Sequence, residues 1–341
     1  MSTKNLLDPN HHPCIKDDDT LRGRLGKRYR PPKGLLEAVN VALLLERPLL
    51  LTGKAGCGKT DFAWAAANAL GNLLNCSPEQ KILLEAYVRS DTLAKDLLYS
   101  YDSVRRFGDA NHGGKESLKC ADDVRNYIEL QALGIALASP HRRVVLIDEL
   151  DKAPRDLPND LLRELEQNSF DILEIPRDIH YEKRVSSHNI PLYRMMKRPV
   201  DEKSNKPLPA PLVIITSNVE RQLPDPFLRR CIFYNIEFPS GESLIEILKD
   251  HFPNLINQKV FLTNVINIFV ELRKTHGLNK APGTSELLDW TTSLTQVYHQ
   301  KSVELQIAKF VSSSTKDWEK LPGLSCLVKL REDEISLFQT K

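Results

Sequence analysis

Long apolar runs are absent from this sequence of 341 residues. The longest one, Val41–Leu45, is followed at once by Glu46 and Arg47, whereas a membrane-spanning helix needs about 20 apolar residues in a row. Residues 1–19 also lack the apolar core of a secretory signal. We therefore expect a cytoplasmic protein that has no membrane partner.

Cysteine is scarce, and the total charge is nearly balanced. The six cysteines form no C-x-x-C pair, which argues against a zinc ribbon or a thioredoxin-type redox site and fits a reduced compartment. The formal net charge is only +2, so the chain as a whole is not a polyelectrolyte. Residues 1–34 and 176–210 are nevertheless basic, since each segment contains eight basic and four acidic side chains. These two segments are the candidates for contact with an acidic partner.

Short apolar segments alternate with helical patterns over the first two-thirds of the chain. The segments Val144–Ile147 and Leu212–Thr216 have no polar alternation, as expected of parallel strands that are covered on both faces. Apolar residues at helical spacing lie between the strands, for example in Asp61–Leu70. The alternation predicts an α/β fold around a central parallel sheet, with strands near residues 49–52, 81–87, 144–147 and 212–216.

The length predicts about two domains, and the pattern of the sequence changes at several places. The N-terminal residues are polar and contain four prolines, whereas the strand patterns stop after Pro239. The expected divisions are a polar N-terminal arm (1–33), an α/β domain (34–239) with insertions near 99–128 and 170–210, a small all-helical domain (240–310) and a C-terminal tail (311–341).

A glycine-rich segment between an apolar strand and a helix fits the pattern G-x-x-x-x-G-K-[ST]. In such a loop, small residues let successive backbone N–H groups surround a polyphosphate, and the following helix adds its N-terminal dipole. The lysine reaches the β- and γ-phosphates of ATP, and the hydroxyl binds Mg²⁺. A glycine-rich turn with a chance lysine is the alternative, but the place between strand and helix favours an ATP site. The site comprises Gly53, Lys54, Ala55, Gly56, Cys57, Gly58, Lys59, Thr60 and, at the start of the helix, Asp61.

Two carboxylates follow the apolar strand at 144–147. Asp148, at the carboxyl end of the strand, can complete the Mg²⁺ shell that Thr60 begins. Glu149 is placed to act as the general base toward the water that attacks the γ-phosphate. The alternative is an acidic surface pair that caps the next helix. A phosphate loop upstream in the same chain makes this alternative less favoured.

Polar residues also follow the strand at 212–216. Asn218 can orient the attacking water, although an Asn in this place is more often only a turn residue. Further along the chain, Arg229 and Arg230 form a basic pair, and such pairs are usually solvated or paired with acids. Neither feature identifies a site alone, so their order along the chain has to be considered.

In this order, the motifs resemble those of an AAA+ ATPase of the MoxR family. The resemblance runs from about Tyr29 to Trp290 and implies a P-loop NTPase (AAA+) parallel-sheet domain followed by a small all-helical lid. It rests on the helix at 34–45, the phosphate loop, Asp148–Pro154, Pro158–Leu162, Asn218 and Leu228–Arg230.

The resemblance implies roles for single residues. Asp148 and Glu149 correspond to the Walker B motif, and Asn218 corresponds to sensor 1. The arginine finger, which enters the site of the neighbouring subunit, falls on Arg230, with Arg229 as the alternative. Proteins of this kind assemble into homo-oligomeric rings, of which a hexamer is favoured.

The chain departs from the family at sensor 2. Residues 280–288 contain no arginine, and only Lys280 could replace it. The insertions near 99–128 and 170–210 fall where relatives contact substrate in the ring pore. The second insertion could grip an acidic protein segment or nucleic acid, or it could be a solvated loop; its basic residues are Arg177, Lys183, Arg184, Arg194, Lys197, Arg198, Lys203 and Lys206.

The function implied by the resemblance is ATP hydrolysis with Mg²⁺ that drives chaperone-like remodelling of a protein client, such as a protein with a von Willebrand A domain. Two alternatives remain open. A nucleic-acid-associated AAA+ motor of a restriction or defence system is supported only by the two basic segments. A non-hydrolysing ATP-binding switch is supported by the missing sensor-2 arginine and opposed by the Asp148-Glu149 pair.

Overall fold

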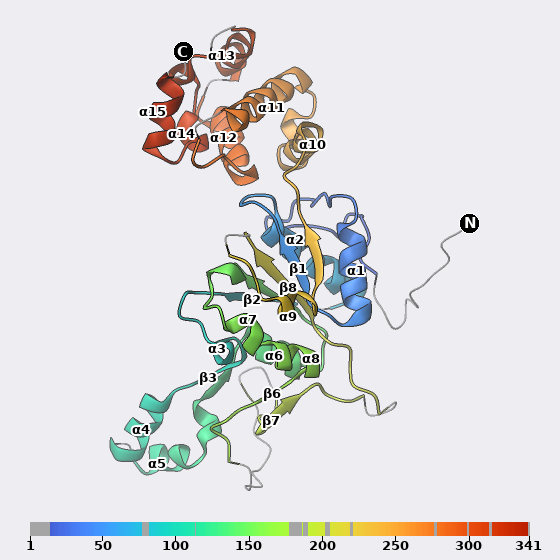
Figure 1. Ribbon diagram of the computed structural model, residues 1–341, viewed down its shortest axis with the longest axis vertical. Coiled ribbons are helices and arrows are strands. Elements are labelled where there is room, and N and C mark those ends of the chain that lie inside the picture. The colour runs from blue at the N-terminus through green and yellow to red at the C-terminus, as the bar shows by residue number, and fades with distance from the viewer. Residues whose placement is uncertain are drawn as a thin grey trace, which may run out of the picture.

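A five-stranded parallel sheet lies at the centre of the molecule, in the order β2-β5-β8-β1-β9 (Figure 1). Its strands are β1 (Leu49–Thr52), β2 (Leu83–Tyr87), β5 (Val144–Asp148), β8 (Leu212–Ser217) and β9 (Ile232–Asn235). The sheet confirms the predicted α/β fold class. The computed structural model describes residues 14–76, 82–112, 114–176, 186, 190–201, 205–218, 221–275, 278–298, 300–313 and 316–339.

Helices cover both faces of this sheet because successive side chains of each buried strand point to opposite sides. Leu49 and Leu51 of β1 belong to one apolar cluster, together with helices α1 (Leu35–Leu45) and α2 (Lys59–Leu73). Leu50 belongs to the cluster on the other face. The helices of that face are α3 (Ala94–Leu98), α6 (Ala132–Ala138), α7 (Leu157–Asp160), α8 (Leu162–Gln167) and α9 (Asp225–Leu228), and the single turn η2 (Leu150–Lys152) follows β5.

The segment 14–33, which we expected as part of a polar arm, contributes to the core. Ile15, Leu21 and Tyr29 are buried in the cluster of α1 and α2. The backbone of Ile15 exchanges two hydrogen bonds with the side chain of Asn40 on α1. Apolar residues spaced six or eight apart in an otherwise polar stretch thus fasten this segment to the α/β domain.

Two small antiparallel sheets occupy the regions that we expected as insertions. The first pairs β3 (Tyr99–Tyr101) with β4 (Ile128–Leu130), and between them stand α4 (Ser103–His112), α5 (Lys115–Asp122) and the turn η1 (Val124–Tyr127). The second pairs β6 (Ser169–Asp171) with β7 (Met195–Lys197). The α4–α5 pair projects from the molecule at the end opposite to the last helices (Figure 1).

The basic side chains of the second insertion differ in their surroundings. Arg194 donates to the carbonyl oxygens of Leu173 and Ile175, and Arg198 pairs with Glu46 at 2.8 Å. Arg194 therefore bonds within the insertion, whereas Arg198 fastens the insertion to Glu46, just after α1. Of the two expectations for this segment, the solvated loop does not hold for these two arginines. Arg177, Lys183, Arg184 and Lys203 lie outside the described residues.

The last third of the chain is helical and has a core of its own. Trp290, Phe269 and Leu262 are buried there together with Trp318 and Leu337, which lie beyond residue 311. The expected tail therefore packs against the helical region, although the domain boundaries remain a proposal. The elements are α10 (Gly241–His251), η3 (Pro253–Leu255), α11 (Lys259–Lys274), α12 (Thr284–Gln296), α13 (Gln300–Ser312), η4 (Trp318–Lys320), α14 (Leu324–Leu327) and α15 (Arg331–Gln339).

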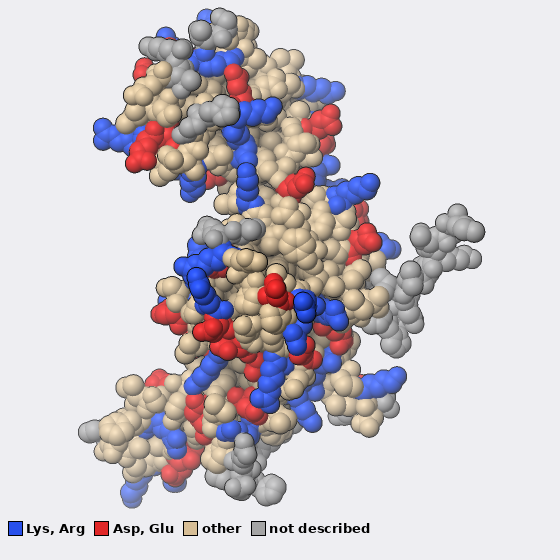
Figure 2. Space-filling model, viewed as in Figure 1, with Lys and Arg blue, Asp and Glu red and all other residues tan. Residues whose placement is uncertain are grey.

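Charged side chains of both signs are interspersed on the visible face of the molecule (Figure 2). This distribution agrees with the formal net charge of +2. None of the described helices is long and apolar enough to cross a membrane.

The packing of the N-terminal segment predicts that Leu21→Ala destabilises the protein. Leu21 is 0% exposed, and a buried Leu→Ala change costs about 2–5 kcal/mol because apolar contacts are lost and a cavity is left. The free energy of unfolding from urea denaturation measures this cost. Leu25→Ala is the matched control, since Leu25 is 73% exposed and should change the value by no more than about 0.5 kcal/mol. Equal stability of the two variants would mean that the segment is not part of the fold.

Candidate functional site

The glycine-rich loop connects β1 to α2, as its sequence predicted. Gly53, Gly56 and Gly58 have φ angles of 144°, 75° and 94°, which side chains other than glycine rarely adopt. A Cβ atom on Gly53 would lie 2.4 Å from the carbonyl oxygen of Ile236, and one on Gly56 would lie 2.8 Å from Cα of Gly283. The glycines are therefore required by the backbone conformation and by close neighbours.

Lys59 is folded back into this loop. Its side chain is buried, and Nζ donates to the carbonyl oxygens of Gly53 at 2.7 Å and Lys54 at 3.1 Å. Cys57 packs beside it as a small buried group, and burial raises the pKa of its thiol. Lys54 and Ala55 are exposed. The ammonium of Lys59 is thus held by neutral carbonyls that an anion can replace.

Asp148 joins the phosphate loop to the carboxyl end of β5. The Thr60 hydroxyl donates to its carboxylate at 3.1 Å, and the Thr216 hydroxyl donates to it at 2.6 Å. A hydroxyl and a carboxylate are oxygen ligands that suit Mg²⁺, so Thr60 and Asp148 fit this ion. The described residues contain no group of three or more His, Cys, Asp or Glu that could hold a metal, so nucleotide phosphates and water would complete its shell.

Thr216 is a residue of the site that our sequence analysis did not single out. Its hydroxyl accepts the backbone N–H of Glu149 at 2.9 Å while it donates to Asp148, so one side chain holds the Asp148 carboxylate and the backbone of Glu149. The signal was a hydroxyl residue at the end of an otherwise apolar strand. That signal becomes informative only when β8 is known to pair with β5.

Glu149 lies at the start of the turn after β5, with a positive φ of 58°. Its carboxylate is 2.5 Å from Nζ of Lys152 and 3.5 Å from Nδ2 of Asn218. The backbone N–H of Asn218 is held in turn by Asp151 at 3.1 Å. The predicted base and the predicted water-orienting amide are therefore brought together, and a lysine is added to them.

A pocket of about 850 Å³ opens between the phosphate loop, the N-terminal segment, α10 and α12. Asp148, Glu149 and Asn218 line it together with residues 55–61. Tyr29 forms part of its wall; its ring lies 5.5 Å from the ring of Phe62, and burial raises the pKa of its phenol well above the usual value. The volume falls in the range of ligand pockets.

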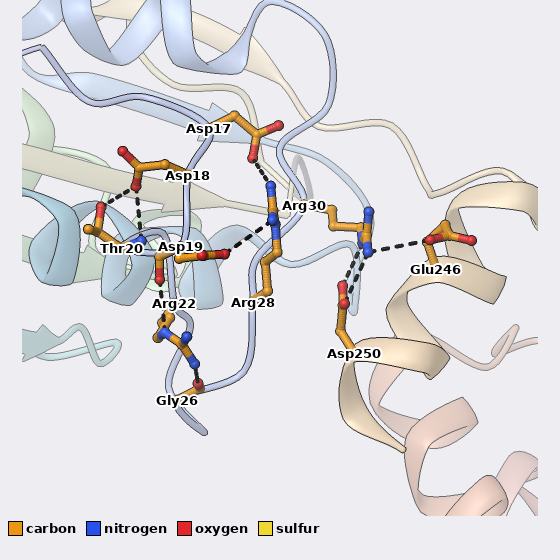
Figure 3. A network of polar contacts seen from close by, with 10 residues as sticks. All are labelled: Asp17, Asp18, Asp19, Thr20, Arg22, Gly26, Arg28, Arg30, Glu246 and Asp250. Carbon is orange, nitrogen blue, oxygen red and sulfur yellow. Dashed lines mark hydrogen bonds and ion pairs between the residues drawn. The ribbon is translucent and has the colours of Figure 1, made fainter. Parts of the chain in front are cut away.

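Asp61 lines this pocket, but its carboxylate serves the N-terminal segment. Oδ1 accepts the backbone N–H of Arg24 at 2.8 Å, and burial raises the pKa of the group. The N-terminal segment also contacts the helical region, since Arg30 bonds to Asp250 and Glu246 of α10 (Figure 3). The segment thus connects the two sides of the pocket.

The helical region meets the phosphate loop at the start of α12. The backbone N–H of Thr284 donates to the carbonyl oxygen of Gly56 at 3.2 Å, and both Thr284 and Ser285 line the pocket. Lys280, the candidate for sensor 2, does not line the pocket, and its backbone N–H bonds to Asp333 at 3.0 Å. Of the described residues from 240 onward, no Lys or Arg lines the pocket.

Arg229 and Arg230 lie away from the pocket of their own chain, which neither residue lines. Arg230 is paired with Glu166 and donates to the carbonyl oxygen of Pro226 at 3.0 Å. Arg229 is exposed. The two predicted finger positions are therefore separate from the cluster of Thr60, Asp148 and Glu149.

Comparison with known proteins relates this site to a family. Residues 48–221, just over half of the chain, match the family described as AAA domain (dynein-related subfamily). A solved structure of a candidate ATPase from Cytophaga hutchinsonii is 16% identical, with a TM-score of 0.35; the match covers 70% of this chain and 61% of that one. No curated protein matches the sequence. The extent of the family match shows that the chain belongs to the AAA domain family, in its dynein-related subfamily.

Proposed function

We propose that this chain is a MoxR-like AAA+ ATPase that hydrolyses ATP to drive chaperone-like remodelling of a protein partner. The observation that carries this proposal is a contact between the end of the phosphate loop and the end of β5. The Thr60 hydroxyl, in the first turn of α2, lies 3.1 Å from the Asp148 carboxylate. When bound there, Mg²⁺ would neutralise charge that develops on the phosphates. The family match supports nucleotide binding in general.

The side chains of the site have distinct tasks in this reaction. Lys59 exchanges its carbonyl partners for the β- and γ-phosphates. Water attacks the γ-phosphorus, the bond to the β-phosphate oxygen breaks, and Glu149 accepts the proton of the water. Asn218, whose amide contacts Glu149, orients that water. ADP and phosphate form directly, without a covalent enzyme intermediate.

Glu149→Gln should abolish turnover while ATP stays bound. The amide keeps the shape of the side chain but cannot accept a proton, and loss of a general base costs about 10²–10⁴-fold in rate. Phosphate release measures turnover, and calorimetric titration measures binding.

The matched control is Glu129→Gln, which makes the same chemical change at an exposed position of β4 outside the pocket. It should hydrolyse ATP at the parental rate. If Glu149→Gln also hydrolyses ATP at the parental rate, another group is the base. A parental protein that binds ATP but releases no phosphate would contradict the proposed ATPase activity itself.

One contact favours a second candidate function, a switch that binds ATP and does not hydrolyse it. Nζ of Lys152 is 2.5 Å from the Glu149 carboxylate, so this ion pair occupies an oxygen that would have to accept the proton of the water. The pair is partly exposed, so bound nucleotide can separate it at little cost. The phosphate-release assay of the parental protein distinguishes the switch from the ATPase.

The proposal of a protein client is supported by the projecting α4–α5 pair. Val104 is 82% exposed and Phe107 is 67% exposed, and the two lie three residues apart on α4. Exposed apolar side chains that cluster on one face are typical of surfaces that contact other proteins. The motifs that resemble MoxR proteins extend the proposal to a client with a von Willebrand A domain.

A nucleic-acid motor has less support than the sequence alone gave it. Arg28 and Arg30 of the first basic segment are in ion pairs with carboxylates of this chain, and so is Arg198 of the second. Cations that are neutralised within the protein contribute little to phosphate binding. Positive and negative side chains are also interspersed on the visible face (Figure 2).

The ring proposal predicts that inactive subunits complement each other. Arg230 lies outside the pocket of its own chain, which supports its use in a neighbouring site. Lys59→Ala should lose phosphate binding, and Arg230→Ala should lose about 10³–10⁵ in rate. Mixed Lys59→Ala and Arg230→Ala subunits should recover part of the activity in phosphate release, because some interfaces then contain both Lys59 and Arg230.

Arg229→Ala is the control for the choice of arginine. If Arg229→Ala is inactive and Arg230→Ala is active, the finger moves by one residue and the ring stays. No recovery at any mixing ratio would contradict the use of an arginine from a neighbouring subunit.

A further inference from the structure

The basic cluster in residues 22–30 divides into two groups in the structure. Three of its arginines are bonded within the protein. Arg22 bonds to carbonyl oxygens of Asp19 and Gly26, and Arg28 pairs with Asp17 and Asp19. Arg30 pairs with Asp250 and Glu246 (Figure 3). The other two cations are Arg24 and Lys27, and neither forms an ion pair with a carboxylate of the described residues.

Arg24 and Lys27 are held on a short hairpin. A β-bridge joins Arg22 to Arg28, and the backbone N–H of Gly23 bonds to the carbonyl oxygen of Lys27 at 2.9 Å. Gly26 turns the chain with a positive φ of 68°. Both unpaired cations therefore stand on a backbone that is fixed by its own hydrogen bonds.

This hairpin is docked on α2, the helix that begins at the phosphate loop. Asp61 accepts the backbone N–H of Arg24 at 2.8 Å, and Asn68 donates to the carbonyl oxygen of Arg22 at 2.6 Å. A Cβ atom on Gly23 would lie 2.2 Å from Asp61, so the two segments touch closely. On the hairpin, only backbone atoms of Arg22 and Arg24 take part in these two hydrogen bonds. The guanidinium of Arg24 is therefore not used in the docking.

The side chain of Arg24 lies beside the first turns of α2 and lines the pocket. Its guanidinium is 6.0 Å from the ring of Trp64. Trp64 is four residues beyond Thr60 on α2, and residues with this spacing share one face of a helix. Arg24 and Lys27 both line the pocket that contains Thr60 and Asp148.

The opposite wall of the pocket carries the other sign of charge. The titratable residues of the helical region that line it are Glu242, Glu246 and His251, and that wall has no described Lys or Arg. A nucleoside triphosphate is strongly anionic, so its charge has to be met from other parts of the chain. Lys59 of the phosphate loop is one of these, and the hairpin with Arg24 and Lys27 is another.

We propose that Arg24 and Lys27 bind the phosphate chain of the nucleotide from within the same subunit, and so take the place of a basic group that the described residues of the helical wall do not supply. This inference rests on the proposed function, since it assumes that the pocket takes ATP. It assigns a binding role to two of the five basic residues and a structural role to the other three.

The test compares nucleotide affinities of the full chain. Arg24→Ala/Lys27→Ala should bind ATP about 10- to 100-fold more weakly than the parental protein, because charge-assisted hydrogen bonds are lost. The loss should be smaller for ADP and smallest for AMP, as fewer phosphates remain. Calorimetric titration measures ATP and ADP, and competition measures AMP.

Two controls accompany the double variant. Lys33→Ala removes an exposed cation of the same segment that does not line the pocket, and it should bind ATP as the parental protein does. Arg24→Lys/Lys27→Arg keeps both charges and should retain most of the affinity. If the double Ala variant loses its fold in thermal unfolding, Arg24→Gln/Lys27→Gln replaces it, since Gln keeps more of each side chain.

The outcomes separate this inference from the proposed function. Parental ATP affinity in the double variant overturns the inference, while the ATPase activity of the parental protein can still stand. An equal loss for ATP, ADP and AMP also overturns it, because the contact would then be with a group that all three share and not with the β- and γ-phosphates. A parental protein that binds no ATP contradicts the proposed function instead.

Discussion

The contact of Thr60 with Asp148 depends on β8, the strand that pairs in parallel with both β1 and β5. Parallel pairing places the carboxyl ends of the three strands at one edge of the sheet. The phosphate loop follows β1, the two carboxylates follow β5, and Asn218 follows β8. Thr216 then bridges Asp148 and Glu149 at this edge. The chemistry of the site is thus assembled by backbone pairing between strands that are far apart in the sequence.

The N-terminal segment is the third part of the protein that surrounds the pocket, together with the sheet domain and the helical region. It is buried through Ile15 and Leu21, it docks on α2 through Asp61, and it reaches α10 through Arg30. A single stretch of chain therefore contacts the start of the phosphate-binding helix and the helical region.

Local patterns in the sequence predicted the parts of the site that depend on local structure. The loop from Gly53 to Thr60 could be recognised because its glycines and its lysine act within one turn between strand and helix. The pair Asp148-Glu149 could be recognised from the apolar strand before it. The fifth strand, β9, was not predicted, because it is short and only half-buried at the edge of the sheet.

Features that depend on distant partners could not be predicted. Arg198 pairs with Glu46, 152 residues away, and Arg30 bonds to Asp250, 220 residues away. The spacing of apolar residues in the sequence does not indicate such contacts. From the sequence alone, these arginines were therefore interpreted as parts of solvated basic segments. Likewise, the sequence around Asp61 does not indicate that its carboxylate accepts a hydrogen bond from the backbone of Arg24 in the N-terminal segment.

The central claim is that the pocket beside the phosphate loop binds ATP through Lys59. Calorimetric titration of MgATP into the parental protein, Lys59→Ala and Lys33→Ala tests it most directly. Lys33 is an exposed lysine that does not line the pocket, which makes it a control for the loss of one positive charge. The account predicts one ATP per chain for the parental protein and for Lys33→Ala, and no measurable binding for Lys59→Ala. Parental affinity in Lys59→Ala would contradict it.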